Sequence, residues 1–308
     1  MIKQITTYLN LKNKYGFKEG TYLFGMRYCN RKKYYDLIIK KITREFHDEI
    51  VAFKSNIGNF YNYPINRSGK CKIWVLWFQG YSDMPELIKK CYKSLLNNAD
   101  SKKYEVILLD KNNINDYINI PEHIKVKFQS KKISYTHLSD SIRMLLLSQY
   151  GGIWIDSTCY FIKKMDEDIL NFAFFSSKIE KNKSHFFNEG KWSTYFMAAG
   201  EKNCVPAFLN YMFTSYWKKN DYLCDYFLLD IFMEIGYREI DVIRDLVDRV
   251  PINNDNPMIV LDNWNKKINN RYENIINNSL FVKLNWRIDG RYKKGTVGEY
   301  INDSLHRL

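Results

Sequence analysis

Residues 140–158 read DSIRMLLLSQYGGIWIDST, and this stretch decides the fold. Its first part has apolar residues at helical spacing, with Asp140 and Arg143 one turn apart. Two glycines then end the helix, and an apolar strand follows that stops at Asp156. Open α/β sheets bind ligands beyond the carboxyl ends of their strands. The stretch therefore predicts a buried strand that ends in a carboxylate at a binding edge.

Strands and helices alternate on both sides of this stretch. Apolar runs at 72–78 and 104–109 predict strands buried on both faces, with a helix opened by Pro85 between them. A shorter run at 124–128 is a candidate third strand. This alternation predicts an α/β fold with a mainly parallel sheet flanked by helices. Further strands are expected at 171–176, 194–198 and 281–286, and further helices at 206–217, 225–235 and 241–250.

Two regions are expected along the chain. Residues 1–69 predict a basic helical extension, because apolar residues recur at helical spacing between lysines and arginines up to about residue 55. A connector rich in asparagine and glycine follows. Residues 70–308 are expected to form the main α/β domain, which ends in a basic C-terminal tail.

The composition excludes several classes of protein. The chain has 308 residues, 45% of them hydrophobic, and no apolar run approaches the roughly 20 residues that cross a bilayer. The first residues do not resemble a signal peptide. The six cysteines are scattered without a Cys-x-x-Cys pair, which fits reduced thiols in a cytoplasmic protein. The net charge of +13 fits solvated lysines, or a basic face that rests on anionic lipid at the inner face of the cell membrane.

The residue types of the decisive stretch suit a sugar nucleotide. A diphosphate needs cationic groups or a divalent cation, and hydroxyl groups need carboxylate acceptors. Asp156, followed by Ser157 and Thr158, supplies a carboxylate and two hydroxyls that suit Mg²⁺ or Mn²⁺. A base needs an apolar slot, and four residues at the end of the first strand are candidates for it: Trp74, Trp77, Phe78 and Gln79.

Each of these residues also has a purely structural explanation. Asp140 and Arg143 could form a surface ion pair on one helix turn. The two glycines could serve as a helix stop, and Asp156 could cap the next turn. It is the fixed order of acidic and basic helix residues, two glycines, aromatic strand and terminal Asp156 that favours a binding site.

This order of motifs resembles the bacterial capsular polysaccharide synthesis glycosyltransferases. They are relatives of the family 32 sugar transferases and, more distantly, of the large clostridial glucosylating toxins. Besides residues 133–158, the likeness includes segments 72–80, 84–87, 104–110 and 225–230. It therefore covers roughly residues 70–255, with a weaker echo at Lys283 and Leu284.

The resemblance implies a Rossmann-like glycosyltransferase A-type catalytic domain, a nucleotide-sugar donor and retention of anomeric configuration. Asp140 and Arg143 would contact the donor, and Asp156 would be the first acid of an Asp-x-Asp metal and sugar motif. The third position is Thr158, as in related enzymes with an Asp-x-Thr form, and Val282 stands where relatives carry a histidine. The implied Mn²⁺ or Mg²⁺ would then be held by Asp156 and Thr158, with fewer carboxylates than usual.

Further site residues follow from the same resemblance. Asp225 and Asp230 would lie near the acceptor as catalytic residues, although an aspartate at a helix start also serves as an N-cap. Gly152, Lys283 and Trp286 would complete the donor site. Lys283 and Trp286 would belong to a flexible basic segment that closes over the diphosphate. The histidines have no spacing of a triad or zinc site and are interpreted as structural.

Three functions are consistent with these observations. The first is a retaining transferase that moves a hexose from UDP-galactose or UDP-glucose to a lipid-linked oligosaccharide during synthesis of a capsule or exopolysaccharide repeat unit. The second is a nucleic-acid-binding protein, suggested by the charge and the aromatic content but lacking any known module. The third is a non-catalytic scaffold on the same fold that binds a sugar nucleotide.

Overall fold

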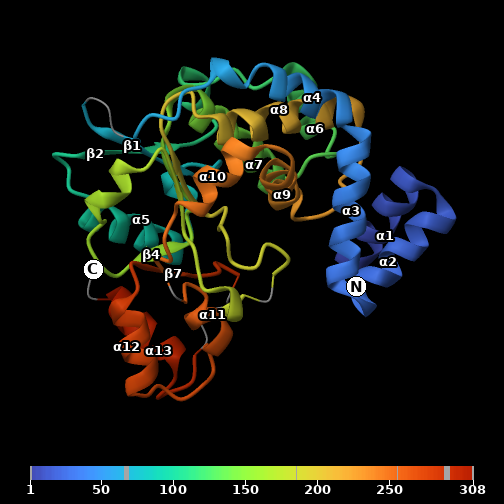
Figure 1. The fold of residues 1–308 in the computed structure, drawn as a ribbon. Coiled ribbons are helices and arrows are strands. Elements are labelled where there is room, and N and C mark those ends of the chain that lie inside the picture. The colour runs from blue at the N-terminus through green and yellow to red at the C-terminus, as the bar shows by residue number, and fades with distance from the viewer. Residues whose placement is uncertain (1, 66–68, 185, 255, 288–291, 307–308) are drawn as a thin grey trace.

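The structure is a computed structural model, and it describes residues 2–65, 69–184, 186–254, 256–287 and 292–306. Its centre is a five-stranded sheet in the order β2-β1-β3-β6-β5 (Figure 1). β1 pairs in parallel with β2 and β3, whereas β6 runs antiparallel to both β3 and β5. Four of the five strands therefore point the same way. The strands are β1 Cys71–Leu76, β2 Tyr104–Leu109, β3 Gly152–Ile155, β5 Phe174–Ser176 and β6 Phe196–Ala199.

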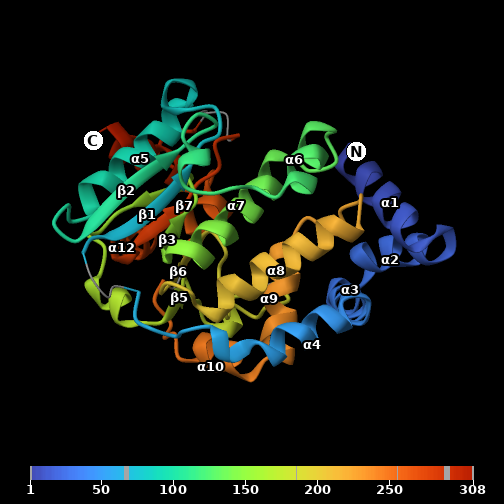
Figure 2. The same cartoon turned by 90° about the horizontal axis from the view of Figure 1, so that it is seen from above.

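Helices cover the sheet, as Figure 2 shows. α7 follows β2 and packs against α8, while α5 connects β1 to β2 and contacts the short strand β4. The connection from β1 to β2 moves in one direction across the sheet and that from β2 to β3 moves back past β1, and connections of one hand then place their helices on opposite faces of a parallel sheet. The predicted fold class, a mainly parallel sheet flanked by helices, is therefore confirmed. The helices are α5 Glu86–Asn98, α6 Glu122–Gln129, α7 Tyr135–Tyr150, α8 Cys204–Lys219, α9 Leu228–Glu239 and α10 Asp241–Asp248.

The candidate strand at 124–128 was a wrong prediction, since these residues lie in helix α6. Pro121 stands just before the helix and Glu122 in its first turn, both favourable positions for those residue types. The apolar residues alternate as in a strand, but Ile124 is buried and Val126 is half exposed. α6 packs against α8 through its buried side. Alternation over five residues could not distinguish the two structures.

The C-terminal part forms a smaller helical unit below the sheet in Figure 1. Strand β4 (Cys159–Phe161) pairs antiparallel with β7 (Phe281–Lys283), which is shorter than the strand predicted at 281–286. Two helices before β7 and one after it share a second hydrophobic core with these strands. The expected basic tail ends in one of these helices, whose apolar side chains Val297 and Ile301 are buried. The helices are α11 Ile259–Asn263, α12 Asn270–Asn278 and α13 Val297–His306.

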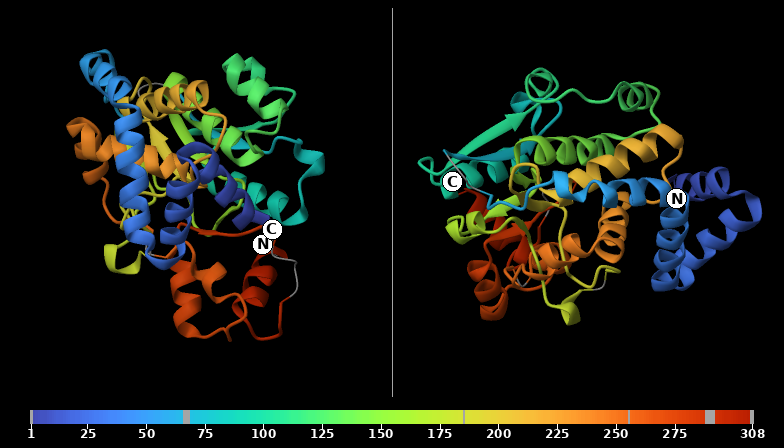
Figure 3. Two further views of the ribbon diagram at one scale, coloured as in Figure 1. Left: turned by 90° about the vertical axis from the view of Figure 1, so that its right-hand side faces the viewer. Right: turned by 45° about the horizontal axis from the view of Figure 1, so that its top comes forward.

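The N-terminal region is helical, as predicted. The α1–α2 hairpin stands at one end of the molecule (Figure 3), while α3 packs on α9 and α4 on α8. Buried side chains of α3 belong to the same hydrophobic core as the sheet. Among the described residues, no helix is long and apolar enough to span a membrane. The four helices are α1 Ile2–Tyr15, α2 Phe17–Cys29, α3 Arg31–Glu45 and α4 His47–Ser55.

The two glycines before β3 allow a very close approach of backbones. Gly152 has φ +91°, and a Cβ atom placed there would lie 2.4 Å from the carbonyl oxygen of Lys72 on β1. A Cβ atom at Gly151 would lie 2.7 Å from the carbonyl oxygen of Ala199. No flexible side chain could yield, because both obstacles are backbone atoms. Gly152 is therefore required by the packing of the sheet. This requirement accounts for the glycine without the donor contact that was expected for it.

Substitution of Gly152 tests this requirement. We expect Gly152→Ala to lower the free energy of unfolding by about 2 kcal/mol or more, through a positive φ and a backbone clash. The control is Gly25→Ala on the exposed side of α2, where no atom lies within 4 Å of the new Cβ. It should be neutral or stabilise by about 0.5–1 kcal/mol. Urea unfolding followed by circular dichroism measures both, and equal stability of the two variants would contradict the argument.

Candidate functional site

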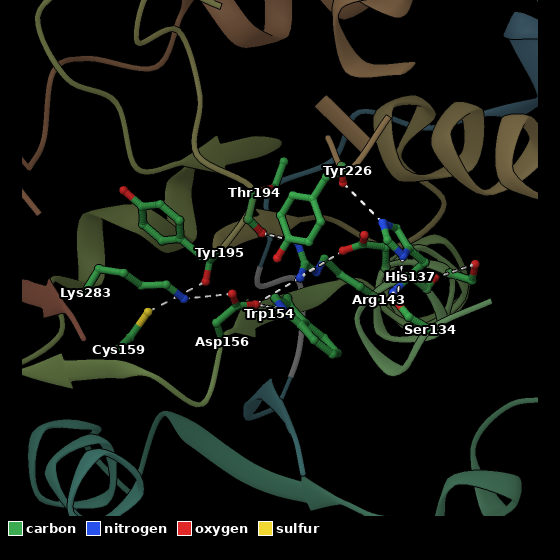
Figure 4. A network of polar contacts seen from close by, with 12 residues as sticks. Ser134, His137, Arg143, Trp154, Asp156, Cys159, Thr194, Tyr195, Tyr226 and Lys283 are labelled. Atoms are coloured by element: carbon green, nitrogen blue, oxygen red, sulfur yellow. Dashed lines mark hydrogen bonds and ion pairs between the residues drawn. The ribbon is translucent and has the colours of Figure 1, made fainter. Parts of the chain in front are cut away.

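A carboxylate at the end of β3 is the centre of the candidate site (Figure 4). Asp156 Oδ1 accepts hydrogen bonds from Arg143 Nη2 and Trp154 Nε1, both at 2.9 Å. Asp156 Oδ2 accepts from Lys283 Nζ at 2.8 Å. Burial alone would raise the pKa of Asp156, but Lys283 and Arg143 lower it below its usual value. Asp156 is thus an ionised carboxylate held between two cations.

Three elements place these groups. Asp156 follows the last residue of β3, as predicted, and Arg143 projects from α7. Lys283 is the last residue of β7, where it pairs with Cys159 of β4. Lys283 was expected on a flexible segment that closes over the diphosphate, and this prediction was wrong, because the lysine belongs to a hydrogen-bonded strand. Its ammonium group also lies 5.0 Å from the centre of the Tyr195 ring.

Arg143 is a buried residue of the site. Its side chain is 5% exposed, so the alternative of a surface ion pair does not apply. It lies 3.4 Å from Asp140 Oδ1, donates to the Thr194 carbonyl, and stacks over the Trp154 ring at 4.9 Å. Its Nε atom is buried without a partner among the described residues. Burial raises the pKa of Asp140, although the charge of Arg143 opposes this.

The two aspartates predicted near the acceptor lie in different surroundings. Asp230, in the first turn of α9, is buried and accepts a hydrogen bond from Trp192 Nε1 at 3.1 Å. Burial raises the pKa of Asp230 to about 7, with Asp140 and Arg143 close enough to influence it. The described hydrogen bond of Asp230 is to Trp192, and its expected catalytic role stays a prediction.

Asp225 is engaged elsewhere. Its Oδ2 atom accepts hydrogen bonds from Arg27 of α2 and, at 2.8 Å, from the hydroxyl group of Tyr34 of α3. Its Oδ1 atom accepts from the backbone N–H of Phe227 at 2.9 Å, just before α9. Both oxygens are thus occupied, which does not fit the catalytic role expected for Asp225. The alternative of a helix N-cap does not hold either, because the N-cap of α9 is Phe227 and Asp225 binds the N–H of that residue in the turn before the helix.

The four residues expected to form the slot for the base have different surroundings in the structure. Trp74 is fully buried, and its indole donates to the Gly151 carbonyl at 2.9 Å. It therefore supports the turn before β3 and is not available to a ligand, which corrects the prediction. Trp77 lies just beyond β1 with its ring centre 6.2 Å from that of Trp286, and its Nε1 atom has no described partner. Phe78 packs on Phe128 and Tyr135, and Gln79 is exposed.

Several residues of the site were missed by the sequence analysis. Trp154 lies two residues before Asp156 and so on the same face of the strand, a signal that could have identified it. Tyr195 and Thr194 lie next to β6, whose antiparallel pairing with β3 brings their carbonyl groups to Asp156 and Arg143. No local pattern indicates such a contact.

His137 and Tyr226 form a second connection that sequence reasoning missed. His137 Nε2 lies 3.2 Å from the Tyr226 carbonyl oxygen, and its Nδ1 lies 2.7 Å from Ser134 Oγ. A carbonyl oxygen can only accept, so Nε2 carries the proton and Nδ1 accepts from Ser134. Burial, together with the negative charges of Asp140 and Asp156, raises the pKa of the half-exposed Tyr226. The Tyr226 phenol therefore lies at the same cluster.

The residues around Asp156 do not fit a divalent cation. Both carboxylate oxygens already contact cations, and in the part of the chain that the structure describes no three His, Cys, Asp or Glu residues group as metal ligands. Val282 is fully buried in the second core, and the Thr158 carbonyl accepts from the Leu284 N–H at 2.8 Å. Hard cations require several oxygen ligands. The expected Mn²⁺ or Mg²⁺ site, with Asp156 and Thr158 as ligands, is not supported by this set of residues.

The mainly parallel sheet with paired charges at a strand end defines an α/β protein of the kind that binds ligands beyond the carboxyl ends of its strands. This chain belongs to the capsular polysaccharide synthesis protein family, whose sequence model matches residues 24–303. The match begins within α2 and so includes α3 and α4.

Two individual proteins are similar to this chain. The O-glycosyltransferase braB of Annulohypoxylon truncatum is 25% identical over 135 residues, which are 41% of this chain and 30% of that protein. The chain thus spans about a third of the length of this curated relative. The solved structure of the PaToxG glycosyltransferase aligns with a TM-score of 0.40 and 14% identity, over 80% of this chain and 94% of that one.

The raised pKa of Asp230 predicts a pH dependence of stability. Its folded pKa, about 7, exceeds the ordinary value of 3.8. The stabilisation by this group is therefore complete below about pH 4 and is lost as the pH rises toward 7. Asp230→Asn mimics the protonated form at every pH. Relative to wild type, we expect this variant to gain on the order of 2 kcal/mol of stability between pH 5 and pH 8.

Urea unfolding at both pH values measures this difference. Asp245→Asn on the exposed side of α10 is the control, and its effect should not vary between the two pH values. If the difference between wild type and Asp230→Asn stays constant from pH 5 to pH 8, Asp230 titrates normally and the argument is wrong.

Proposed function

We propose that this protein is a retaining glycosyltransferase of capsular or exopolysaccharide repeat-unit synthesis. In this proposal it moves a hexose from UDP-galactose or UDP-glucose to a lipid-linked oligosaccharide. Membership of the capsular polysaccharide synthesis family supports the process, and the name of the fungal relative supports the reaction. Retention and the identity of the donor follow from the resemblance of the motifs. The observation that carries the proposal is the Asp156 carboxylate held between Arg143 and Lys283.

The charges of this cluster suit both halves of the donor. Arg143 and Lys283 supply the positive charge that a diphosphate requires as it becomes the leaving group. Asp156 and Asp140 supply acceptors for hydroxyl groups of the ribose or the sugar. An aromatic pair at the end of β1, Trp77 with Trp286, offers the base a stacking surface. One donor molecule could therefore be held by groups from β1, α7, β3 and β7.

The acceptor would enter on the side of α9. Asp230 lies there as a buried carboxyl group whose pKa of about 7 suits proton exchange near neutral pH. Tyr226, whose carbonyl group contacts His137, has a half-exposed ring that could contact a saccharide. We assign Asp230 the role of a catalytic acid or base and Tyr226 a role in acceptor contact.

The α1–α2 hairpin is proposed to rest on an anionic membrane surface, where a lipid-linked acceptor would reside. Phe17 is 63% exposed and Tyr22 and Tyr28 about half exposed, so apolar rings project from this hairpin. The same region also carries exposed basic residues on α2 and α3: Lys18, Arg31, Lys32, Lys33 and Lys40. Aromatic rings beside lysines and arginines are typical of surfaces that bind anionic lipid.

Nucleotide binding tests the donor site. We expect UDP to raise the melting temperature by several degrees, because a ligand of the native state stabilises that state. GDP and CDP test the choice of base. Slow hydrolysis of UDP-galactose or UDP-glucose should fall by at least about a hundredfold in Asp156→Asn. Asp168→Asn, on the exposed surface of the short turn after β4, should behave as wild type.

The same measurements separate the alternatives. Nucleotide binding without hydrolysis, even with a panel of acceptors, would support the scaffold. Hydrolysis that is unchanged in Asp156→Asn would remove this carboxylate from the site.

Lipid binding tests the hairpin. We expect co-sedimentation with vesicles that contain phosphatidylglycerol and much weaker binding to phosphatidylcholine vesicles, with the difference reduced by salt. Phe17→Ser combined with Tyr22→Ser should lower binding to the anionic vesicles by about tenfold or more, since each buried ring contributes apolar area. Val126→Ser on α6, an exposed apolar residue of the main domain, is the control. Equal binding by both variants would remove the hairpin from membrane contact.

A further inference from the structure

We infer that the donor site of this protein works without a divalent cation, because the Lys283 ammonium group occupies the place beside Asp156 that a metal ion would take. This inference rests on the proposed function and specifies how the diphosphate is neutralised. It assigns Lys283 as the group that faces the leaving phosphate together with Arg143.

Both carboxylate oxygens of Asp156 already accept hydrogen bonds from protein groups. Its two oxygens accept three hydrogen bonds of 2.8–2.9 Å, two of them from cations. A divalent ion at carboxylate distance would lie next to the ammonium group of Lys283 and close to the guanidinium group of Arg143. These cations are 14% and 5% exposed, so solvent would screen little of the repulsion. The ion would have to displace Lys283 before Asp156 could become a ligand.

The backbone of Lys283 is fixed where it is. β7 pairs with β4, which begins three residues after Asp156, and the Leu284 N–H donates to the Thr158 carbonyl at 2.8 Å. On the other side, the Lys283 N–H donates to the Pro257 carbonyl at 2.7 Å. The ammonium group, in turn, is bracketed by Asp156 and the Tyr195 ring. Lys283 is therefore a built-in cation of the site and not a mobile surface lysine.

A lysine can take over the electrostatic task of the metal. Its ammonium group is a compact charge with three donors, which suits phosphate oxygens. On donor binding, Lys283 can contact the diphosphate from the same strand position while Asp156 keeps Arg143 and Trp154 as partners. The site then supplies two positive charges to the leaving group from protein alone.

The test is UDP binding to the full chain by isothermal titration calorimetry, after removal of metals with EDTA. We expect the dissociation constant in EDTA to stay within about twofold of that in millimolar Mn²⁺, because the protein supplies the cations itself. Lys283→Met keeps the length of the side chain and removes its charge, and it should weaken UDP binding by at least about tenfold in both conditions. Lys164→Met, an exposed lysine near β4, should bind as wild type. Circular dichroism confirms that each variant is folded.

Two outcomes would overturn the inference, and they differ in what else they overturn. UDP binding that is lost in EDTA and restored by Mn²⁺ would show that a metal is needed and would leave the proposed function intact. If UDP, GDP and CDP fail to bind in either condition, the proposed function falls, and the inference falls with it. If Lys283→Met proves unfolded, Lys283→Arg provides the second comparison, since it retains the charge and should retain binding without metal.

Discussion

The ion cluster around Asp156 is the interaction on which the rest of the structure depends. Arg143, Asp156 and Lys283 come from three elements, and each is largely shielded from water. A buried charge without a partner is far less stable than one that is paired, so these elements must meet at this point. The rotation of α7 and the position of β7 are thereby fixed relative to the end of β3. The same requirement attaches the smaller C-terminal unit to the edge of the sheet.

A backbone constraint puts the carboxylate in its place. Gly151 and Gly152 let the chain turn from α7 into β3 within contact of β1 and β6, closer than any side chain would allow. Trp74 closes this turn from β1 by its hydrogen bond to the Gly151 carbonyl. The close backbone approach at Gly151 and Gly152 and the ion cluster at Asp156 thus act on the two ends of β3. Together they fix the position of this strand. Asp156 therefore reaches both cations from the end of a fixed strand, and no flexible loop is needed to bring it to them.

Local patterns in the sequence were sufficient to predict the central strands and helices, but not the contacts between segments that are distant in the chain. The helix, glycines and strand of residues 140–158 are adjacent in sequence, and β2 spans the residues predicted for it. The direction of Trp74 was not predictable, because a strand buried on both faces has no polar residues to mark its sides. Asp225 and Lys283 were misjudged for another reason. Their partners, Arg27 and Asp156, lie more than a hundred residues away.

The salt bridge between Arg27 and Asp225 joins the α1–α2 hairpin to the segment before α9. Arg27 belongs to the hairpin that we propose to rest on lipid, and its salt bridge to Asp225 is shielded by the protein. Tyr226 follows directly, and Asp230 lies one helix turn further on. Removal of the hairpin would leave the buried Asp225 with the Tyr34 hydroxyl and the Phe227 N–H but without its cation, which costs more than the loss of an exposed salt bridge. The α1–α2 hairpin is therefore tied through Asp225 to the segment that leads into α9, so the surface that we propose to bind lipid and the residues that we propose to contact the acceptor are held by one buried salt bridge.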